Sequence, residues 1–520
     1  MHRFFEFDDI IHAVLQHVKS SPTDLVNVAM TCSRLAGPAL NILWSEQHSL
    51  APLIMCLPED AWEVTEDHTI NLSREPTPIE WERLRINASR VRRLLTDDCE
   101  PLELQPSGRV LQRLFERFPP VRLFPNLFEL DFEAAFGFLE CSSKVLLLRQ
   151  FLSPRLEALA FDVAGLPTHE VEQLLAALPA EAYGLRQMMI LADDGAKTFT
   201  VPPSLGKLPK LTQLAIYAID TCLTKQTINN IQQAQRLQTL NISLRGTSCD
   251  AGDIPFELPS LEILRLFGDS LPQCTHFLRQ VTTRQLQLID ICYYKPARPT
   301  EISALIESLS TLCQNFRSLK QLYLVDSSIV NVDEPAVPLP SQIFRPLFKF
   351  NELVSVVFLG IGDYNLDDRF INDVAVAWPL IQDLKFTASR RRAGCNVTFT
   401  AVMSLASRCR WLQFLHLTCD ATQATIIPRA PDGTNEFWPT QTALCNLHLG
   451  YSEMSEVSGV PYFLAEVFPT LSHFYWYRNT GDFGIEILME AALEVARQEL
   501  RAGSGLECTI EGVSQRSFSE

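Results

Sequence analysis

The hydrophobic residues of this chain recur in one short pattern: an aliphatic residue, two variable residues, a large apolar residue, one variable residue and another large apolar residue. Leu211-Thr-Gln-Leu214-Ala-Ile216 is one copy of this phrase. Thirteen copies begin at Leu127, Leu156, Leu185, Leu211, Leu237, Leu261, Leu286, Leu319, Leu353, Ile381, Leu412, Leu444 and Leu471. Their mean period is about 29 residues, and a fixed period predicts a solenoid whose repeats bury their apolar faces against their neighbours.

Each phrase is expected to form a short strand, because its last two apolar residues stand two positions apart and therefore share one face. Helical patterns follow most of the phrases, at residues 168–178, 224–234, 300–312, 367–378 and 399–408. Proline often precedes the next phrase, as at Pro209 and Pro379, where it ends a helix and favours an extended strand. Residues 485–500 are predicted to be one amphipathic helix that caps the last repeat.

The predicted fold is therefore α/β, with a single curved sheet of about a dozen parallel strands between Leu127 and Trp476 and helices on its convex side. The period lies at the long end of the leucine-rich-repeat range. Because the spacing between phrases runs from 24 to 34 residues, we expect an irregular leucine-rich-repeat horseshoe with the parallel sheet on its concave face.

A different pattern precedes the repeats. Apolar residues at helical spacing predict three small helices in about the first 45 residues. Such a small unit cannot bury all of its apolar surface, so we expect part of that surface to bind a partner. Residues 50–62 also have a helical pattern. Thr77-Pro78-Ile79-Glu80 is a capping box with proline at the first helical position, which predicts the start of another helix.

The N-terminal segment resembles an F-box. Residues 8–18 follow the opening helix of that family, residues 24–34 its second helix, and residues 39–44 its closing Leu-Trp. The family usually begins with Leu-Pro, where this chain has Phe7 and Asp8. Residues 57–62 and 80–94 resemble the connector of the large F-box families of mushroom-forming basidiomycete fungi.

This resemblance implies a substrate-recognition subunit of a cullin-RING, SCF-type ubiquitin ligase. The F-box would bind the Skp-type adaptor and the repeats would bind an unknown target protein. The residues that the resemblance assigns to the adaptor contact are Phe7, Ile10, Ile11, Val14, Leu15, Leu25, Val28, Leu43 and Trp44. The corresponding domains are an F-box at 1–48, a helical connector at 49–120, the solenoid with its capping helix at 121–500 and a flexible tail at 501–520.

The net charge and the cysteine content limit the classes of partner and the cellular location that we expect for this chain. The net charge of −17 argues against nucleic acid as a partner, since phosphate binding needs clustered lysine and arginine. The 14 cysteines include no Cys-x-x-Cys pair, which favours reduced thiols and a cytoplasmic or nuclear location. The acidic N-terminus does not resemble a signal peptide, and no apolar run is long enough for a membrane span.

Motifs for catalysis or cofactor binding are weak. His169-Glu170 lacks the second histidine of a zinc-protease helix, and Gly360-Ile-Gly362 lacks a third glycine. The chain contains no P-loop and no Gly-x-Ser-x-Gly elbow. We therefore expect neither an enzyme nor a cofactor.

The outward positions of the strands differ between the two ends of the repeats. Early phrases carry Glu129, Asp131, Glu133 and Asp162. The last three phrases carry the aromatic, histidine and polar residues that we predict to bind the substrate, namely Phe414, His416, Asn446, His448, His473, Tyr475 and Tyr477. Aromatic side chains dominate binding hot spots, although tight curvature or the C-terminal helix could instead cover this end.

Other interpretations remain open at this level. The N-terminal helices could simply cap the solenoid, and the repeats could be a protein-interaction scaffold that acts without a ligase. A metal site formed by His416, His448 and His473 would be an alternative of a different class. Recovery of a Skp-type adaptor with the purified protein separates the ligase from the scaffold.

Overall fold

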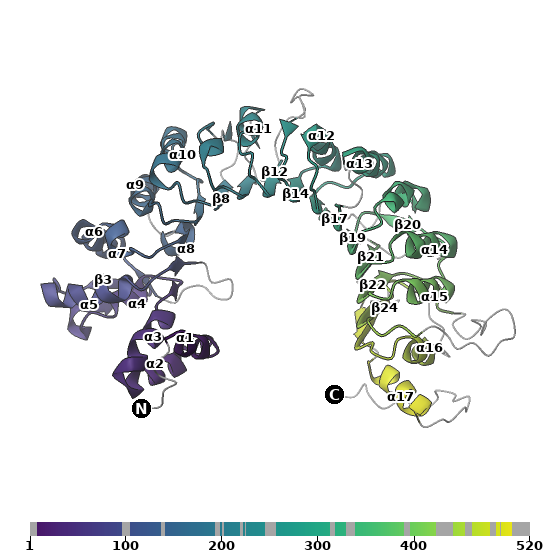
Figure 1. The fold of residues 1–520 in the computed structure, drawn as a ribbon, viewed down its shortest axis with the longest axis horizontal. Coiled ribbons are helices and arrows are strands. Elements are labelled where there is room, and N and C mark those ends of the chain that lie inside the picture. Colours follow the sequence, from purple (N-terminus) through teal and green to yellow (C-terminus); the bar gives the residue numbers. More distant parts are fainter. Residues whose placement is uncertain are drawn as a thin grey trace. The chain divides into compact units, whose positions relative to one another are not determined.

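The computed structural model describes residues 8–95, 104–136, 141–192, 198–199, 202–218, 222–223, 225–244, 256–312, 318–328, 338–388, 396–422, 440–452, 460–478, 485–488 and 490–501. The chain forms two compact units, Met1–Ser248 (unit 1) and Cys249–Glu520 (unit 2). Figure 1 follows the chain through both, with helices α9 to α11 on one side of the strands of unit 1 and helices α12 to α16 on one side of the strands of unit 2.

Unit 1 begins with three helices and continues as a parallel sheet. Its helical segments are α1 (Asp8–Gln16), α2 (Pro22–Thr31), α3 (Ser33–Leu43), α4 (Ala51–Ile54), η2 (Glu59–Ala61), α5 (Pro78–Ala88), α6 (Gly108–Arg117), α7 (Pro120–Leu123), α8 (Phe132–Phe136), α9 (Cys141–Phe151), α10 (Thr168–Glu181), η3 (Leu205–Lys207) and α11 (Lys225–Ile231). The strands of its parallel sheet are, in spatial order, β1 (Glu46–Gln47), β4 (Arg93–Leu94), β6 (Glu129–Asp131), β7 (Ala158–Asp162), β8 (Gln187–Ala192), β10 (Gln213–Ala218) and β12 (Thr239–Ser243).

Unit 2 repeats the same arrangement of strands and helices. Its helical segments are α12 (Leu271–Gln280), α13 (Pro299–Leu312), η4 (Ser341–Lys349), α14 (Asp368–Ala377), α15 (Phe399–Arg408), α16 (Val460–Val467) and α17 (Glu490–Arg501). Its parallel strands are, in order, β14 (Ile263–Gly268), β16 (Leu288–Tyr293), β17 (Gln321–Asp326), β19 (Ser355–Leu359), β21 (Asp383–Thr387), β22 (Phe414–Leu417), β23 (Asn446–His448) and β24 (His473–Arg478). β25 (Ile485–Leu488) follows and pairs antiparallel with β24.

Short accessory strands lie outside these sheets. They are β2 (Trp62–Val64), β3 (Thr69–Leu72) and β5 (Gln105–Pro106) in one small sheet, and the pairs β9 (Thr198–Phe199) with β11 (Cys222–Leu223), β13 (Phe256–Glu257) with β15 (Val281–Thr282), and β18 (Pro338–Pro340) with β20 (Asp363–Asn365).

Rows of buried apolar side chains hold each sheet to its helices. In unit 2 one inward row, at most 2% exposed, runs through Leu264, Ile289, Leu322, Val356, Leu384, Leu415, Leu447 and Phe474. Burial of one such side chain contributes about 1.5–3 kcal/mol. Each phrase of the sequence contains a strand that begins two residues after its first position. The predicted fold, an α/β leucine-rich-repeat solenoid, is confirmed.

Two local predictions were wrong. Residues 50–62 form only the short α4 and η2 before β2 begins, and residues 485–500 are not one helix, because β25 precedes α17. A short apolar run such as Ile485-Glu-Ile487 is compatible with the spacing of a helix and with that of a strand. It forms a strand here, and this strand pairs with β24. Residues 49–120 also contain strands, of which β4 joins the parallel sheet. Phe7 and residues 502–520 lie outside the described residues.

Candidate functional site

The three N-terminal helices share a small core. Ile11, Leu15, Leu25, Ala39 and Ile42 pack together, and each is at most 4% exposed. The hydroxyl of Ser21 accepts a hydrogen bond from the backbone N–H of Asp24 at 3.4 Å and so caps α2. Few residues are available for this core, so other apolar side chains of the same helices remain in solvent.

Two apolar pairs are exposed on the first two helices. Ile10 and Val14 on α1 are 41% and 50% exposed, and Val26 and Met30 on α2 are 41% and 80% exposed. Residues four positions apart lie on one face of a helix, so each pair forms a short apolar strip. These two strips leave apolar surface of the helical unit in contact with solvent.

The structure divides the residues predicted to bind an adaptor. Ile10 and Val14 are exposed, whereas Ile11, Leu15 and Leu25 are buried. Val28 and Leu43 pack partly buried against that core, and Trp44 is partly buried. The three buried residues therefore hold the helices together and do not offer contact surface. Sequence reasoning missed Val26 and Met30, although their four-residue spacing was visible.

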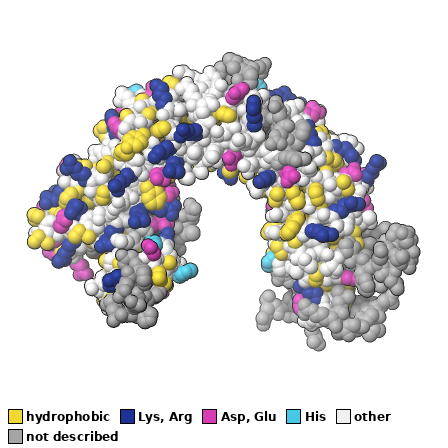
Figure 2. Space-filling model, viewed as in Figure 1, with side chains coloured by type: hydrophobic (Ala, Val, Ile, Leu, Met, Phe, Trp, Pro, Cys, Tyr) yellow, Lys and Arg dark blue, Asp and Glu magenta, His cyan; other side chains and the backbone are white. Residues whose placement is uncertain are grey.

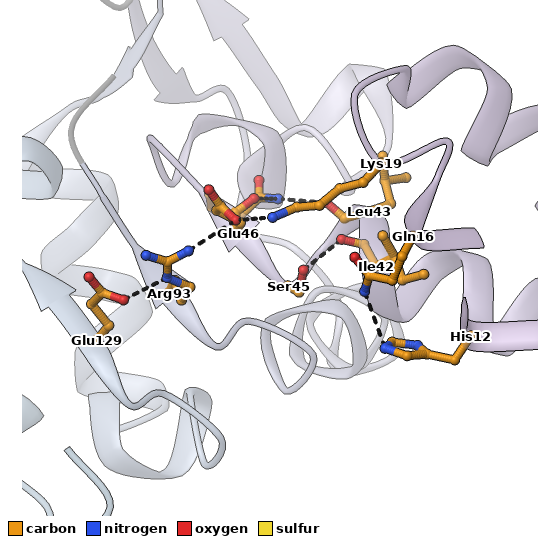
Figure 3. Close-up of polar contacts among 10 residues, drawn as sticks. His12, Gln16, Lys19, Ile42, Leu43, Ser45, Glu46, Arg93 and Glu129 are labelled. Atoms are coloured by element: carbon orange, nitrogen blue, oxygen red, sulfur yellow. Dashed lines mark hydrogen bonds and ion pairs between the residues drawn. The ribbon is translucent and has the colours of Figure 1, made fainter. Parts of the chain in front are cut away.

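A row of charges connects the helices to the sheet (Figure 3). Lys19 Nζ lies 2.5 Å from Glu46 Oε2, Arg93 Nη1 lies 3.5 Å from the same oxygen, and Arg93 Nε donates to Glu129 Oε2 at 2.6 Å. The hydrogen bond from Lys19 lowers the pKa of Glu46. Glu46, Arg93 and Glu129 are register partners on β1, β4 and β6, so the charges alternate along one outward row. Through Lys19, which lies in the turn after α1, this row links the helical segment to the first strands.

The outward residues predicted to bind substrate form two rows across the last strands of unit 2. Phe414, Asn446 and His473 are register partners in one row. His416, His448 and Tyr475 are register partners in the next row. The structure thus brings together side chains that lie about 30 residues apart in the sequence, and we call these residues, together with Tyr477, the aromatic-histidine patch.

Ring stacking organises the patch. The rings of His416 and His448 are stacked, with centroids 4.0 Å apart and planes at 12°. His448 also stacks with Tyr475 at 6.0 Å and lies 4.7 Å from the ring of Tyr477. Tyr451 extends the group, with its ring 4.8 Å from that of Tyr477. Interlocked rings of this kind give a rigid surface with a low entropy cost on binding.

His416 lies beneath this surface. It is 9% exposed, and its Nδ1 is hydrogen-bonded to Thr387 Oγ1 at 3.2 Å. Burial lowers the pKa of His416 to about 3, and the nearby charges of His448 and Lys385 add to this effect. His416 is therefore a neutral ring that supports His448. The prediction that His416 itself contacts the substrate is wrong, because its side chain is buried.

The other patch residues reach the surface. Phe414 is 37% exposed, His473 is exposed, and Asn446, His448, Tyr475 and Tyr477 are partly exposed. Lys385 Nζ lies 5.5 Å from the centre of the Phe414 ring, a cation–π distance. Lys385 also lies 3.3 Å from Asp383. Sequence reasoning missed Lys385 and Tyr451, because neither residue stands at an outward strand position of the last three phrases.

The acidic residues at the other end of the repeats have different surroundings. Glu129 pairs with Arg93, and Lys144 Nζ donates to Glu133 at 2.8 Å. Asp162 accepts a hydrogen bond from the backbone N–H of Ala164 at 2.8 Å, which stabilises the turn after β7. Glu129 and Asp131 line a groove on the outward face of unit 1.

Comparisons with known proteins give no family assignment. No protein-family model and no curated protein matches the chain. Solved structures with some likeness include an internalin from Listeria monocytogenes (13% identity, 62% of this chain and 81% of that one, TM-score 0.30). The yeast Rad7 and Elc1 complex (14%, 75% and 92%, 0.34) and the Drosophila Toll–Spatzle complex (12%, 76% and 52%, 0.36) are others. At such identities and TM-scores the likeness carries no assignment of function.

In the part of the chain that the structure describes, no helix is both long and apolar enough to cross a membrane. Among the same residues, no cluster of three or more histidine, cysteine, aspartate or glutamate side chains is placed to hold a metal ion. Figure 2 shows hydrophobic side chains scattered among charged ones on the visible face of both units.

Proposed function

We propose that this protein is the substrate-recognition subunit of a cullin-RING ubiquitin ligase of the SCF type. In this proposal the three N-terminal helices bind a Skp-type adaptor, and the outward face of the repeats binds the target protein. It assigns the chain no catalytic step and places it in the cytoplasm or nucleus. The observation that carries the proposal is the pair of exposed apolar strips on a helical unit that is anchored to a repeat sheet.

The adaptor half rests on α1 and α2. Their buried residues already form a core, so Ile10, Val14, Val26 and Met30 are not needed for folding in their exposed positions. A cap that only shielded the first repeat would bury its apolar side chains against that repeat and face solvent with polar ones. The exposed strips therefore favour a docking surface over a simple cap.

The substrate half rests on the aromatic-histidine patch. Its rings are held by stacking on the buried His416, and an anchored aromatic surface is typical of binding hot spots. Within unit 1, the ion pairs from Lys19 to Glu129 connect the N-terminal helical segment to the first strands of the sheet.

The adaptor contact is tested by Val14→Asp combined with Met30→Asp. An interface anchor contributes about 2 kcal/mol or more, so each change should weaken binding about 30-fold. The measurement is recovery of a purified Skp-type adaptor with the full-length chain. Ile79→Asp is the matched control, because Ile79 is an equally apolar residue, 74% exposed, on α5.

The expected result is loss of adaptor recovery for the double variant, normal recovery for the control, and unchanged thermal unfolding for both. Undiminished recovery with the double variant would remove the ligase assignment. The repeats would then be a protein-interaction scaffold without a ligase, which is the remaining alternative.

A further inference from the structure

Exposed basic residues gather at the amino ends of the strands of unit 1, in two rows of neighbouring residues. The first row consists of the residues that directly precede the phrases, namely Asn126, Arg155, Gly184, Lys210 and Arg236. In the second row each backbone N–H donates to the carbonyl of the residue before it, and the row consists of Arg92, Phe128, Glu157, Arg186, Thr212 and Gln238. We call the five exposed cations of these rows the basic edge, namely Arg92, Arg155, Arg186, Lys210 and Arg236.

Hydrogen bonds to carbonyl oxygens hold two of these cations in place without neutralising them. Arg155 Nη1 donates to the carbonyl of Pro125 at 3.0 Å, and Arg236 Nη1 donates to the carbonyl of Pro209 at 2.9 Å. Pro209 directly precedes Lys210, so the second bond brings the guanidinium of Arg236 beside another cation. A guanidinium has five N–H donors, and one such bond leaves donors for an anion.

Acidic side chains do not balance the basic edge. Among the described residues of the two rows, Glu157 is the one acid, and it lies 3.5 Å from Arg186 Nε with both side chains more than half exposed. Such an exposed pair contributes little. The corresponding two rows of unit 2 contain one basic residue, Lys320, and two acidic ones, Glu262 and Glu352. A net positive edge is therefore a feature of unit 1, in a chain whose net charge is −17.

We propose that the basic edge binds an extended acidic segment of a partner protein. Neighbouring strands lie about 4.8 Å apart, so Lys210 and Arg236 are close enough to share one carboxylate. Arg155 lies two strands from Lys210, about 10 Å away by the same spacing, and can hold a second carboxylate. Hydrogen bonds between ionised groups are the strong ones, and they relieve the repulsion among the cations.

Two exposed aromatic rings lie among these cations. Phe128, which is 37% exposed, belongs to the second row, and Tyr183, which is 48% exposed, directly precedes Gly184 of the first row. Gly184 lies so close to the preceding repeat that a Cβ would stand 2.2 Å from the carbonyl oxygen of Pro154. The edge thus carries no side chain at this point. The rings offer apolar contact area to the uncharged residues of the same segment.

A protein segment fits this edge better than a nucleic acid does. A peptide can place a neutral residue beside Glu157, whereas a nucleic acid carries a phosphate on every nucleotide. From β4 to β12 the edge crosses five strand intervals, about 24 Å, which is the length of roughly seven extended residues. Beyond this stretch the net charge of −17 repels a polyanion.

This inference goes beyond the proposed function, because no residue of the basic edge belongs to the adaptor-facing strips or to the aromatic-histidine patch. Its test uses the full-length protein and needs no ligase. The probes are two labelled twelve-residue peptides of serine and glycine, one with glutamate and one with glutamine at four alternate positions. A labelled thymidine oligonucleotide of twelve nucleotides is the third probe. Binding of each is measured by fluorescence anisotropy.

At 0.1 M salt, where the Debye length is about 10 Å, the glutamate peptide should bind about tenfold more tightly than the glutamine peptide. This is the factor expected for one charge-assisted hydrogen bond. Because the whole chain is acidic, a preference for the acidic peptide requires a local positive site. Equal binding of the two peptides would overturn the proposal. Tighter binding of the oligonucleotide would overturn it in favour of a nucleic acid.

Two changes then locate the site. Lys210→Glu reverses an exposed charge whose side chain has no hydrogen bond or ion pair to the described residues, and it should abolish the preference. Arg236→Gln removes a charge while an amide can still donate to the carbonyl of Pro209, and it should reduce the preference. Lys320→Glu is the matched control, since it makes the same charge change at an exposed position of unit 2. A preference that survives Lys210→Glu, or that is lost equally in Lys320→Glu, would overturn the assignment.

The outcome is distinguishable from that of the proposed function. Adaptor recovery reports on Val14 and Met30, and peptide binding reports on Lys210 and Arg236. Selective peptide binding without adaptor recovery would leave the basic edge assigned and remove the ligase. Adaptor recovery without selective peptide binding would do the reverse.

Discussion

Lowering the pH from 7.5 to 5.0 should destabilise unit 2 through His416, and His416→Asn should remove that part of the loss. Burial holds the pKa of His416 at about 3 in the folded protein, whereas an exposed histidine in the unfolded chain has a pKa near 6.5. The folded state therefore requires the neutral ring. The stability that depends on it is present above pH 6.5 and is lost progressively as the pH falls from there toward 3.

The magnitude follows from the two pKa values. At pH 5.0 the unfolded state gains about 2 kcal/mol from protonation of this residue, and the folded state gains almost none. One kcal/mol shifts the unfolding temperature by about 2–4 °C in a unit of this size, so His416 should account for about 4–8 °C. Asparagine can keep a hydrogen bond to Thr387 in the place of Nδ1, and it carries no charge at either pH.

The assay is thermal unfolding of unmodified and variant full-length protein at both pH values. Other titrating groups are common to both proteins, so the difference between their pH shifts isolates His416. His473→Asn is the control, because His473 is an exposed histidine on β24, and this variant should retain the full acid sensitivity. Equal acid shifts in His416→Asn and the unmodified protein would refute the argument that a buried neutral imidazole supports the patch.

Three other changes test the framework of the fold by the same unfolding measurement. Trp81→Ala removes a side chain that is 1% exposed, so it should cost about 3–5 kcal/mol, and a loss below 1 kcal/mol would contradict its place in the core. Thr77→Ala breaks the capping box in which Thr77 and Glu80 exchange hydrogen bonds, and it should cost about 0.5–2 kcal/mol, with Thr77→Ser as the near-neutral control. Gly450→Ala should destabilise by more than about 1 kcal/mol, because φ is +54° and a Cβ would lie 2.3 Å from Thr418 Oγ1; an unchanged unfolding temperature would contradict that geometry.

The sequence by itself determined the repeat architecture. In every phrase the spacing of apolar residues marks the strand and its buried face, because side chains alternate along a strand and only one face meets the helices. Local helix signals were equally informative. The capping box at Thr77 starts α5 one residue later, and residues 399–408 form α15 as predicted. Such signals act within a few residues, so they can be read without knowledge of the fold.

Tertiary structure decided the surfaces. Alternation placed His416 and His448 on the outward face, but only the register between β22 and β23 stacks the two rings and buries one of them. The basic edge likewise depends on register, because Arg155, Lys210 and Arg236 come from different repeats and meet only where β7, β8, β10 and β12 pair. Periodicity gives the face of each strand, whereas depth, charge balance and exposure arise between strands, where the neighbours are set by packing.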